Sequence, residues 1–372
     1  MKQEIIDKIN RLASQDEPFL FVINYQADEA FIRKLSDINP EECLFDFEGK
    51  GNFSHARKET WKEEISETTW QIAPPLYEDY EQSFNIVKSN IMAGNSYLTN
   101  LTNRVPVSCN LSLEEIFHRA KGKYKLLLRR KRTQAEDKAH LKEENIEENL
   151  TPFVCFSPET FVRIKGGRIY SYPMKGTLDA SLPNAEKLLM EDRKEAAEHA
   201  TIVDLIRNDL SRVAEDVRVD KYRYVDVLHT NKGDILQTSS EISGRLPEDY
   251  PHHLGEILDA QLPAGSITGA PKDKTMQIIQ EAEGYDRGFY TGIMGIYDQG
   301  ELNSAVMIRF IEEEETSPVD FEADGEKNFK ANEGKKPKKS RKLYFKAGGG
   351  ITSKSDCRRE YEEVIQKIYL PF

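Results

Sequence analysis

The sequence predicts an α+β fold, because strand patterns and helix patterns are both present in its 372 residues. Strand patterns occupy residues 153–172, 290–311 and 343–351, where apolar and polar side chains alternate as they do along half-buried strands. A helix pattern begins near residue 80, where apolar residues recur every three or four positions. A chain of this length can form one large domain or two ordinary ones, and it can bury a substantial core.

The first hundred residues predict three elements in order. Phe19–Ile23 is an unbroken apolar run that predicts a buried strand, and residues 52–75 predict a loop with mixed structure. Residues 80–92 predict an amphipathic helix, which Gly94 ends, and residues 96–102 then predict a strand. The apolar positions of this helix are Tyr80, Phe84, Val87 and Ile91.

The composition excludes several classes of protein. Acidic residues (64) outnumber basic residues (52), which gives a net charge of −12. This balance opposes non-specific binding to nucleic acid and to anionic membranes, where basic residues supply the attraction. No segment has the ~18 uninterrupted apolar residues of a membrane span, and the N-terminus has no signal-type apolar stretch. The four cysteines are scattered without a CxxC pair, so we expect reduced thiols in a cytoplasmic protein with neither nucleic acid nor membrane as a partner.

Two charged segments interrupt the apolar patterns. A basic stretch followed by a mostly acidic one makes residues 121–148 a predicted charged hairpin or arm on the surface. Residues 312–342 contain few apolar side chains and predict a mobile loop between strands at residues 305–311 and 343–347. The basic run at residues 335–342 could dock a polyanion, but a solvated loop is the favoured interpretation because a short charge run has little specificity.

A hairpin pattern brings a carboxylate and an amine together. The Gly166–Gly167 pair separates two alternating runs, which is the signal of a two-residue turn. Glu159 and Lys175 then lie at the open end of the same hairpin. A plain salt bridge or two exposed charges is the favoured interpretation of these residues alone. Counting outward from the turn gives the pairs Lys165–Arg168, Glu159–Met174 and Pro158–Lys175.

Carboxylates on two predicted helices are candidate metal ligands. In the helix of residues 193–212, Glu198 shares a face with apolar residues and needs a partner, either a metal ion or an unidentified arginine in a buried salt bridge. In the C-terminal helix, capped by Ser355 or Asp356, three side chains lie on one stripe. They form either an exposed face with an i,i+4 ion pair, contributing ~0.3–0.5 kcal/mol, or a pair of Mg²⁺ ligands beside an anion-binding lysine. These side chains are Glu360, Glu363 and Lys367.

Two glycine-rich segments are candidate anion sites. Residues 265–272 precede a helix that opens with proline, so its free N–H groups and its dipole favour an anion. Residues 347–351 follow a strand, and their bare backbone could approach a carboxylate closely. Neither segment matches a nucleotide-binding fingerprint, so each taken alone is more typical of a turn than of a site.

Seven blocks occur in the order and spacing of one enzyme family. They are SPETF, PMKGT, AEHATIVDLIRNDLSRV, GSITGAPK, YTGIMGIYDQGELNSAVMIRF, AGGGI and EYEEVIQK. Together they resemble the chorismate-utilising enzymes over residues 80–372, apart from the two charged segments. The resemblance implies a single α+β domain of two large, mainly antiparallel sheets packed together, with helices outside and chorismate between the sheets. Residues 1–79 are then a short N-terminal part of the same fold, and residues 80–372 form the chorismate-binding catalytic region.

The resemblance also implies a reaction. Lys175 resembles the lysine of the aminodeoxychorismate synthase component I branch, whereas anthranilate synthases carry alanine there. Lys175 is then expected to attack ring carbon C2 and displace the C4 hydroxyl group, which Glu159 protonates as it leaves. Ammonia adds at C4 and displaces the lysine, giving 4-amino-4-deoxychorismate, a precursor of the p-aminobenzoate in folate. This chemistry requires a neutral Lys175 and a protonated Glu159.

Further residues receive binding roles from the same resemblance. Glu198, Glu360 and Glu363 are the implied ligands of a Mg²⁺ ion, which would hold the ring carboxylate and draw electron density toward it. Arg309 is implied to bind the other carboxylate with its planar fork. The remaining implied substrate contacts are Tyr290, Lys367, Thr268, Gln237 and the backbone of Gly348, Gly349 and Gly350.

The sequence departs from the family pattern in three places. Gln237 occupies the position of the usual histidine, so that ring contact is altered. Leu98 lies near the position of the water-activating lysine of isochorismate-forming members, which argues against water as the nucleophile. The N-terminal segment lacks the tryptophan-binding motif, so we do not expect feedback by tryptophan.

The resemblance leaves a partner and two rival functions to consider. No segment resembles a glutaminase, so we expect ammonia to come from a separate glutaminase subunit. One rival is anthranilate synthase component I, which pyruvate release would reveal. The other is a non-catalytic chorismate-binding regulatory subunit. The combination of Glu159, Lys175 and the Mg²⁺ ligands argues against it, because a pure binder needs neither an acid nor a nucleophile.

Overall fold

Two antiparallel sheets form the centre of the computed structural model, which describes residues 1–53, 68–129, 151–230, 233–315 and 341–372. Within these residues each sheet has nine strands, and all their pairings are antiparallel. The first sheet has the spatial order β11 (Met174–Asp179), β13 (Gly233–Arg245), β10 (Arg168–Ser171), β9 (Thr160–Lys165), β16 (Glu301–Val306), β15 (Ile293–Asp298), β1 (Phe19–Ile23) and β2 (Ala30–Lys34), with β12 (Glu215–Thr230) beside β13. The second sheet has the order β14 (Gly269–Ala270), β6 (Leu98–Cys109), β18 (Arg341–Ile351), β17 (Phe310–Glu315), β8 (Phe153–Ser157), β7 (Tyr124–Leu128), β3 (Cys43–Phe47) and β4 (Lys50–Gly51), with β5 (Trp70–Ile72) beside β6.

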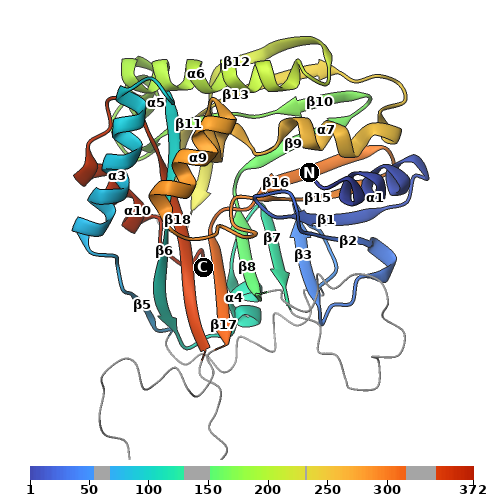
Figure 1. Cartoon of the computed structure of the whole chain (residues 1–372), viewed down its shortest axis with the longest axis horizontal. Coiled ribbons are helices and arrows are strands. Elements are labelled where there is room, and N and C mark those ends of the chain that lie inside the picture. The colour runs from blue at the N-terminus through green and yellow to red at the C-terminus, as the bar shows by residue number, and fades with distance from the viewer. Residues whose placement is uncertain (54–67, 130–150, 231–232, 316–340) are drawn as a thin grey trace, which may run out of the picture.

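Helices lie outside the two sheets (Figure 1). Against the first sheet pack α1 (Gln3–Ser14), α5 (Ala185–Glu191), α6 (Arg193–Leu210), η4 (Tyr250–His253) and α7 (Leu254–Gln261). Against the second sheet pack α3 (Tyr77–Met92), α4 (Leu113–Arg119), α9 (Lys272–Glu283) and α10 (Cys357–Gln366). Two short elements complete the fold, η1 (Leu35–Asp37) and α8 (Gly265–Thr268). In the part of the chain that the structure describes, no helix has the length and apolar character needed to cross a membrane.

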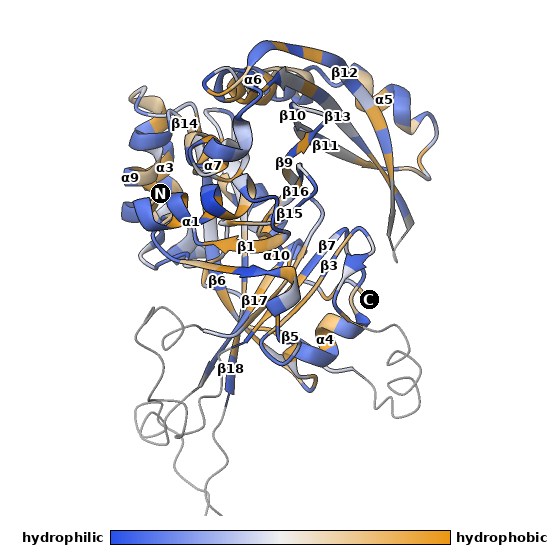
Figure 2. Ribbon diagram, turned by 90° about the vertical axis from the view of Figure 1, so that its right-hand side faces the viewer, coloured by the Kyte–Doolittle hydropathy of each residue, from blue (hydrophilic) through white to orange (hydrophobic). Residues whose placement is uncertain are grey.

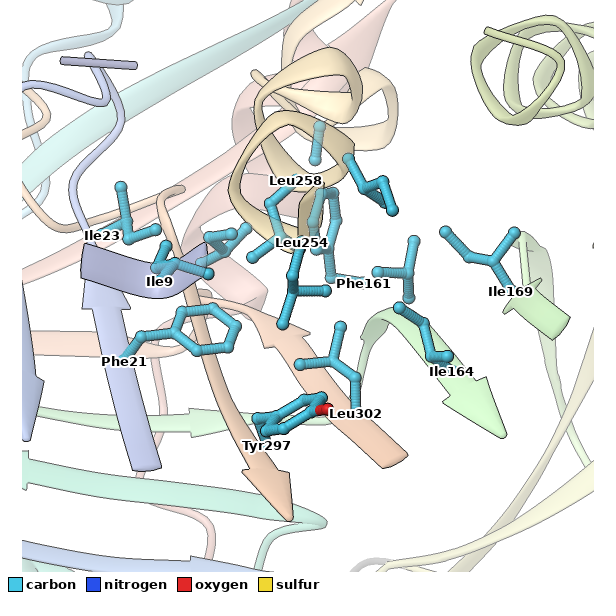
Figure 3. Packing of buried hydrophobic residues seen from close by; sticks show 14 of the residues in the cluster. Ile9, Phe21, Ile23, Phe161, Ile164, Ile169, Leu254, Leu258, Tyr297 and Leu302 are labelled. Atoms are coloured by element: carbon cyan, nitrogen blue, oxygen red, sulfur yellow. The ribbon is translucent and has the colours of Figure 1, made fainter. Parts of the chain in front are cut away.

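The core has three layers, because successive side chains of a strand point to opposite faces of its sheet and each sheet is covered on both faces. Along β1, the side chains of Phe21 and Ile23 point to the helix-covered face, whereas those of Leu20 and Val22 point to the other sheet. Figure 3 shows Phe21 packed in the helix-side cluster with residues of α1 and α7. Figure 2 shows hydrophobic residues concentrated in the central strands and hydrophilic residues on outer helices such as α1. The sheets therefore bury both of their faces and make a rigid frame.

Several predicted elements are confirmed. The apolar run Phe19–Ile23 is the fully buried strand β1. The helix expected over residues 80–92 is α3, and its buried residues are the four apolar positions named above. The hairpin turn is also confirmed, since Lys165 pairs with Arg168 and both glycines of the turn have positive φ. The predicted α+β class with two packed antiparallel sheets is the observed architecture.

The predicted surface arm at residues 121–148 is wrong over its first part. Tyr124–Leu128 is β7, a buried strand between β3 and β8. Basic neighbours hid this short apolar run in the sequence. Lys125 itself is 3% exposed, and its Nζ donates to the carbonyls of Phe117 (3.3 Å) and Ala120 (3.2 Å) at the end of α4. Residues 130–148 lie outside the described residues, as does most of the predicted loop at 312–342, although β17 extends into it.

The strand expected over residues 305–311 is two strands, β16 and β17, which belong to different sheets. The predicted pairs Glu159–Met174 and Pro158–Lys175 are also wrong, because β11 pairs with β13 and not with the chain before β9. In its observed register, Met174 faces Ser239 and Lys175 faces Thr238. Both errors have one cause, namely that alternation along a chain does not reveal where it leaves a sheet.

Candidate active site

The two sheets are joined at a pair of corners where the chain passes from one to the other. Glu159 lies at the first corner, between β8 of the second sheet and β9 of the first. Arg309 lies at the second, between β16 of the first sheet and β17 of the second. The Val306 N–H donates to the Glu159 carbonyl (3.2 Å), and the Phe156 N–H donates to the Arg309 carbonyl (3.1 Å). The two corners therefore lie side by side, and they bring a carboxyl group near a guanidinium group.

Burial and a hydrogen bond set the state of the Glu159 carboxyl group. Burial raises the pKa of Glu159, while a hydrogen bond from Ser266 and the positive charges of Arg309 and Lys175 oppose that rise. The Ser266 hydroxyl donates to Glu159 Oε1 at 2.5 Å. Because the pKa lies above its ordinary value, the carboxyl group stays protonated to a higher pH than an exposed glutamate. It can then act as a general acid.

Lys175 reaches the same region from β11. A bulge in the pairing of β11 with β13 lies at Gly176, whose φ is +76°. This conformation suits glycine, and an added Cβ would also lie 3.0 Å from Glu195 Oε2. The Lys175 Nζ lies 3.2 Å from Glu198 Oε2 on α6, and the two side chains are 34% and 20% exposed. The partner that the sequence demanded for Glu198 is therefore this lysine.

The C-terminal helix brings two carboxylates and a lysine to the glycines of β18. Lys367 Nζ lies 2.7 Å from Glu363 Oε1 and donates to the Gly348 carbonyl at 2.9 Å. Burial and the negative charge of Glu363 raise the pKa of Glu360, whereas Lys367 and Lys175 oppose that rise. Lys175 is thus close enough to influence both Glu159 and Glu360. The helix begins at Cys357, and the Asp356 carboxylate caps it by accepting from the Arg359 N–H at 3.0 Å.

The glycines belong to β18 and do not follow it. Opposite them on β6, Thr102 pairs with Gly348 and Asn100 with Gly350. A Cβ on Gly348 would lie 2.6 Å from the Leu101 carbonyl oxygen, so the strand approaches β6 too closely for any other residue. At Gly349 an added Cβ would lie near Glu360 Oε2 (3.6 Å), Lys367 Nζ (3.7 Å) and Glu363 Oε1 (3.9 Å). The backbone of β18 therefore forms one wall of the space that these side chains line.

The predicted metal ligands fit Mg²⁺ in donor type but do not form a closed cluster. Glu360 and Glu363 are neighbours whose repulsion raises the pKa of Glu360, and carboxylate oxygens are the ligands that Mg²⁺ prefers. Glu198 is bound to Lys175. Among the described residues, no three carboxylate, imidazole or thiol groups gather into a metal site as they stand. Mg²⁺ usually takes one or two carboxylates and completes its shell with water and substrate, and these residues fit that pattern in donor type.

The other predicted substrate contacts come from several elements, among them the second corner, where Arg309 lies. The Arg309 guanidinium group lies over the Tyr369 ring (5.4 Å), and the positive charge of Arg309 influences Tyr290. Arg309 has φ +56° and Thr291, which follows Tyr290, has φ +62°; such backbone strain in residues other than glycine is concentrated at functional sites. Thr268 is fully buried, and its hydroxyl makes no hydrogen bond of ordinary geometry in the described chain. Gln237 is half-buried on β13, opposite Thr177 on β11.

Sequence reasoning missed the role of Ser266. This residue lies in the GSITGAPK block, but only its hydrogen bond to Glu159 reveals what it does. A small cavity of about 30 Å³ borders both side chains, and its wall also includes Asp209 and Gln261. Asp209 forms an ion pair with Lys272 (2.9 Å). The lysine that the sequence placed in an anion-binding loop is therefore already paired.

The profile of one family, described as chorismate binding enzyme, matches residues 64–323. The chain belongs to this family. A protein of Haemophilus influenzae described as an uncharacterized PabA-like protein is 43% identical over 99% of this chain and 97% of its own. A protein of Pasteurella multocida with a similar description is 41% identical over 98% of both chains. Aminodeoxychorismate synthase component 1 of Bacillus subtilis is 28% identical over 83% of this chain and 58% of its own.

Solved structures of chorismate-utilising enzymes share the fold. Anthranilate synthase component I from Streptococcus pneumoniae aligns with a TM-score of 0.63 over 94% of this chain and 79% of that one, at 19% identity. The menaquinone-specific isochorismate synthase MenF from Escherichia coli aligns with a TM-score of 0.61 over 98% of this chain and 80% of that one, at 16% identity. The two-sheet architecture inferred from the sequence blocks is thus confirmed.

Proposed function

We propose that this protein aminates chorismate at C4 with ammonia to give 4-amino-4-deoxychorismate, which supplies the p-aminobenzoate of folate. The proposal rests above all on Lys175, whose amine lies against Glu198 and within electrostatic reach of Glu159 and Glu360. An amine beside an acid of raised pKa is the pair that a covalent displacement of a hydroxyl group requires. The aminodeoxychorismate synthase among the relatives supports the same choice.

The chemistry divides into two displacements. In the first, the neutral Lys175 amine bonds to C2, both ring double bonds shift toward C4, and the C4–O bond breaks as Glu159 donates its proton, so that water leaves. In the second, ammonia bonds to C4, both double bonds shift back, and the C2–N bond to Lys175 breaks. The incoming ammonia loses a proton, which restores Glu159. The sum is chorismate plus ammonia giving 4-amino-4-deoxychorismate plus water.

The remaining residues bind and orient the substrate in this proposal. Glu198, Glu360 and Glu363 would hold Mg²⁺, which would bind the ring carboxylate and draw electron density toward it. Arg309 would bind the other carboxylate through two parallel N–H donors. The further contacts would come from Tyr290, Lys367, Thr268, Gln237 and the backbone of Gly348–Gly350.

Product analysis tests the proposal. Purified protein is mixed with chorismate, Mg²⁺ and an ammonium salt, and the products are identified by mass. We expect 4-amino-4-deoxychorismate. Anthranilate and pyruvate would instead identify the reaction named in another relative, anthranilate synthase component 1 of Aquifex aeolicus, which is 34% identical over 57% of this chain and 38% of its own. Binding of chorismate without any turnover would indicate a regulatory subunit.

A second assay addresses the source of ammonia. We propose that a separate glutaminase subunit supplies it, because no part of the sequence resembles a glutaminase. The purified chain should therefore use ammonium but not glutamine. Robust turnover with glutamine by this chain alone would overturn the proposed partner without affecting the reaction.

A further inference from the structure

A buried ion pair lies at the end of α9, away from the proposed reacting groups. Arg287 and Glu283 are 2% and 1% exposed, and they meet through two parallel hydrogen bonds. Nε donates to Oε2 at 2.8 Å and Nη2 donates to Oε1 at 2.6 Å. This fork geometry fixes the plane and direction of the guanidinium group.

The remaining donors of Arg287 reach three separate segments of the chain. Nη1 donates to the Ile267 carbonyl at 2.9 Å and to Thr291 Oγ1 at 3.3 Å, and Nη2 donates to the Asn100 carbonyl at 2.7 Å. With the two bonds to Glu283, these contacts use all five N–H groups of the side chain. The Ile267 carbonyl also accepts from Asn100 Nδ2 at 2.8 Å, so two of the three segments are tied to each other as well.

Each of these segments carries a proposed substrate contact next to the point that Arg287 holds. Ile267 precedes Thr268, Thr291 follows Tyr290, and Asn100 pairs with Gly350 across β6 and β18. The backbone of Arg287 adds to this, because its carbonyl accepts from the Tyr290 N–H at 3.1 Å.

Glu283 extends the connection to the glycine strand. Its Oε1 accepts from the Thr102 N–H at 2.8 Å, and Thr102 pairs with Gly348. The Arg287 carbonyl accepts from Lys346 Nζ at 3.0 Å, on the same strand as the glycines. The ion pair therefore holds β6, β18, the end of α8 and the loop before β15 in one arrangement.

We propose that Arg287 is a positioning residue for the chorismate site: its three hydrogen bonds to Ile267, Thr291 and Asn100, with its side chain fixed by two more to Glu283, set the mutual placement of the Thr268, Tyr290 and Gly350 segments. The inference rests on the proposed function, since those three segments are assigned to chorismate there. Arg287 itself does not touch the reacting atoms. A lysine would keep the charge but has three donors without a planar fork. At least one of the three segments would therefore lose its hydrogen bond.

Binding measurements separate this role from a general contribution to stability. Chorismate is titrated into the protein by calorimetry, with Mg²⁺ and without ammonia. Arg287→Lys should weaken binding about 10–100-fold, as displacements of about 1 Å in a binding constellation do. The KM for chorismate should rise while the KM for ammonium stays unchanged. The pH dependence should also persist, because Lys175 and Glu159 are untouched.

Arg104→Lys provides a matched control. Arg104 lies on β6, forms ion pairs with Glu312 and Glu314 and stacks on Tyr344 (3.5 Å), and within the described residues its side chain makes no hydrogen bond to Ile267, Thr291 or Asn100. The same exchange there should leave chorismate affinity near the wild-type value. Equal affinities in Arg287→Lys and Arg104→Lys would overturn the positioning role and leave the proposed function standing.

Two further outcomes are decisive. If wild-type protein fails to bind chorismate at all, the proposed function falls and the positioning role falls with it. If Arg287→Lys fails to fold, Thr291→Val decides, since it keeps the shape of the side chain and removes the hydrogen bond to Arg287, along with the one that Thr291 donates to the Tyr290 carbonyl. A weaker affinity in Thr291→Val supports the positioning role, and an unchanged affinity overturns it.

Discussion

Two ion pairs between a glutamate and a basic residue differ in how deeply they are buried. Arg287 and Glu283 are sealed in the interior, and every guanidinium donor has an acceptor. Lys175 and Glu198 are partly exposed, at 34% and 20%, and the lysine Nζ lies 3.2 Å from Glu198 Oε2. Both pairs lie beside proposed chorismate contacts, but their surroundings differ.

The difference separates a pair that holds the structure from a pair that contains the proposed nucleophile. A saturated, buried pair is expensive to break, because removing one partner leaves an uncompensated charge in the interior. A partly exposed pair contributes little to the free energy of folding. Either of its groups can therefore exchange its partner for a substrate or a metal ion. The Lys175 amine can therefore leave Glu198 when chorismate binds, whereas Arg287 stays in place.

The largest expected effect concerns Lys175, the proposed nucleophile. Lys175→Ala removes the covalent route, so amination at high ammonium should fall by about 10³-fold or more, as is common when a nucleophile is removed. Chorismate affinity should survive nearly intact, because the pocket, Glu159 and the carboxylates remain. Rates with product mass analysis, together with a titration of chorismate, check both parts.

Lys165→Ala is the control for this change, because Lys165 lies on the turn side of β9, where its side chain is 75% exposed. It should retain full activity. Wild-type rates and products in Lys175→Ala would reduce Lys175 to a charged neighbour and remove the main support for C4 amination.

The second prediction compares the stability of the two pairs directly. Glu283→Gln should lower the free energy of unfolding by about 3–5 kcal/mol, the usual cost of breaking a buried pair from one side. Glu198→Gln should change it by no more than about 1 kcal/mol, since its pair is partly exposed. Urea denaturation of the two variants, at one pH and salt concentration, measures both values. Equal losses would mean that exposure does not distinguish the pairs.

The third prediction concerns Mg²⁺. Glu363→Gln removes one ligand charge without changing volume, so the apparent Mg²⁺ affinity in turnover assays should fall by at least the roughly 10–100-fold seen when even outer-shell partners are lost. Glu362→Gln is the matched control, because Glu362 is the adjacent residue and forms an ion pair with Arg358 (3.0 Å). Full activity of Glu363→Gln at limiting Mg²⁺ would remove the metal assignment.

The smallest expected effect is a shift in pH dependence. The hydrogen bond from Ser266 lowers the pKa of Glu159, against the rise that burial causes. Removing it in Ser266→Ala raises that pKa further, so Glu159 stays protonated to a higher pH. The alkaline decline of the rate should therefore move to higher pH. The maximal rate should change by less than about tenfold, since a net hydrogen bond contributes ~0.5–1.5 kcal/mol. Unchanged or acid-shifted profiles would show that Ser266 does not tune this acid.

The sequence allowed the periodic elements to be predicted, but not the points where the chain changes sheets. Phe19–Ile23 and the helix before Gly94 follow from local patterns that the tertiary structure reinforces. The corners at Glu159 and Arg309 do not, because apolar alternation continues across them while the hydrogen-bonding partner changes. Tyr124–Leu128 was hidden for a different reason, since basic neighbours surround it in the sequence and its own Lys125 is buried by donating to carbonyls at the end of α4.

The candidate site was predictable in composition and only partly in geometry. The ordered blocks pointed to Glu159, Lys175 and Arg309, and the structure places all three near the two corners. The binding of Glu198 to Lys175 was not foreseeable, because the two residues come from different elements. Nor was the role of Arg287, whose five acceptors come from four places in the chain that no local pattern connects.

The bulge at Gly176 has a consequence for how this frame can acquire new chemistry. It lies on β11, which pairs only with β13 within the described residues and lies at one end of the first sheet. Lys175, which precedes the bulge, can thus be substituted without disturbing the packed layers that contain β1 and β7. Natural variation or a designed library at position 175 would sample other nucleophiles against the same acid and the same carboxylates. Under the proposed function, a single side chain on a peripheral strand decides which bond the protein makes.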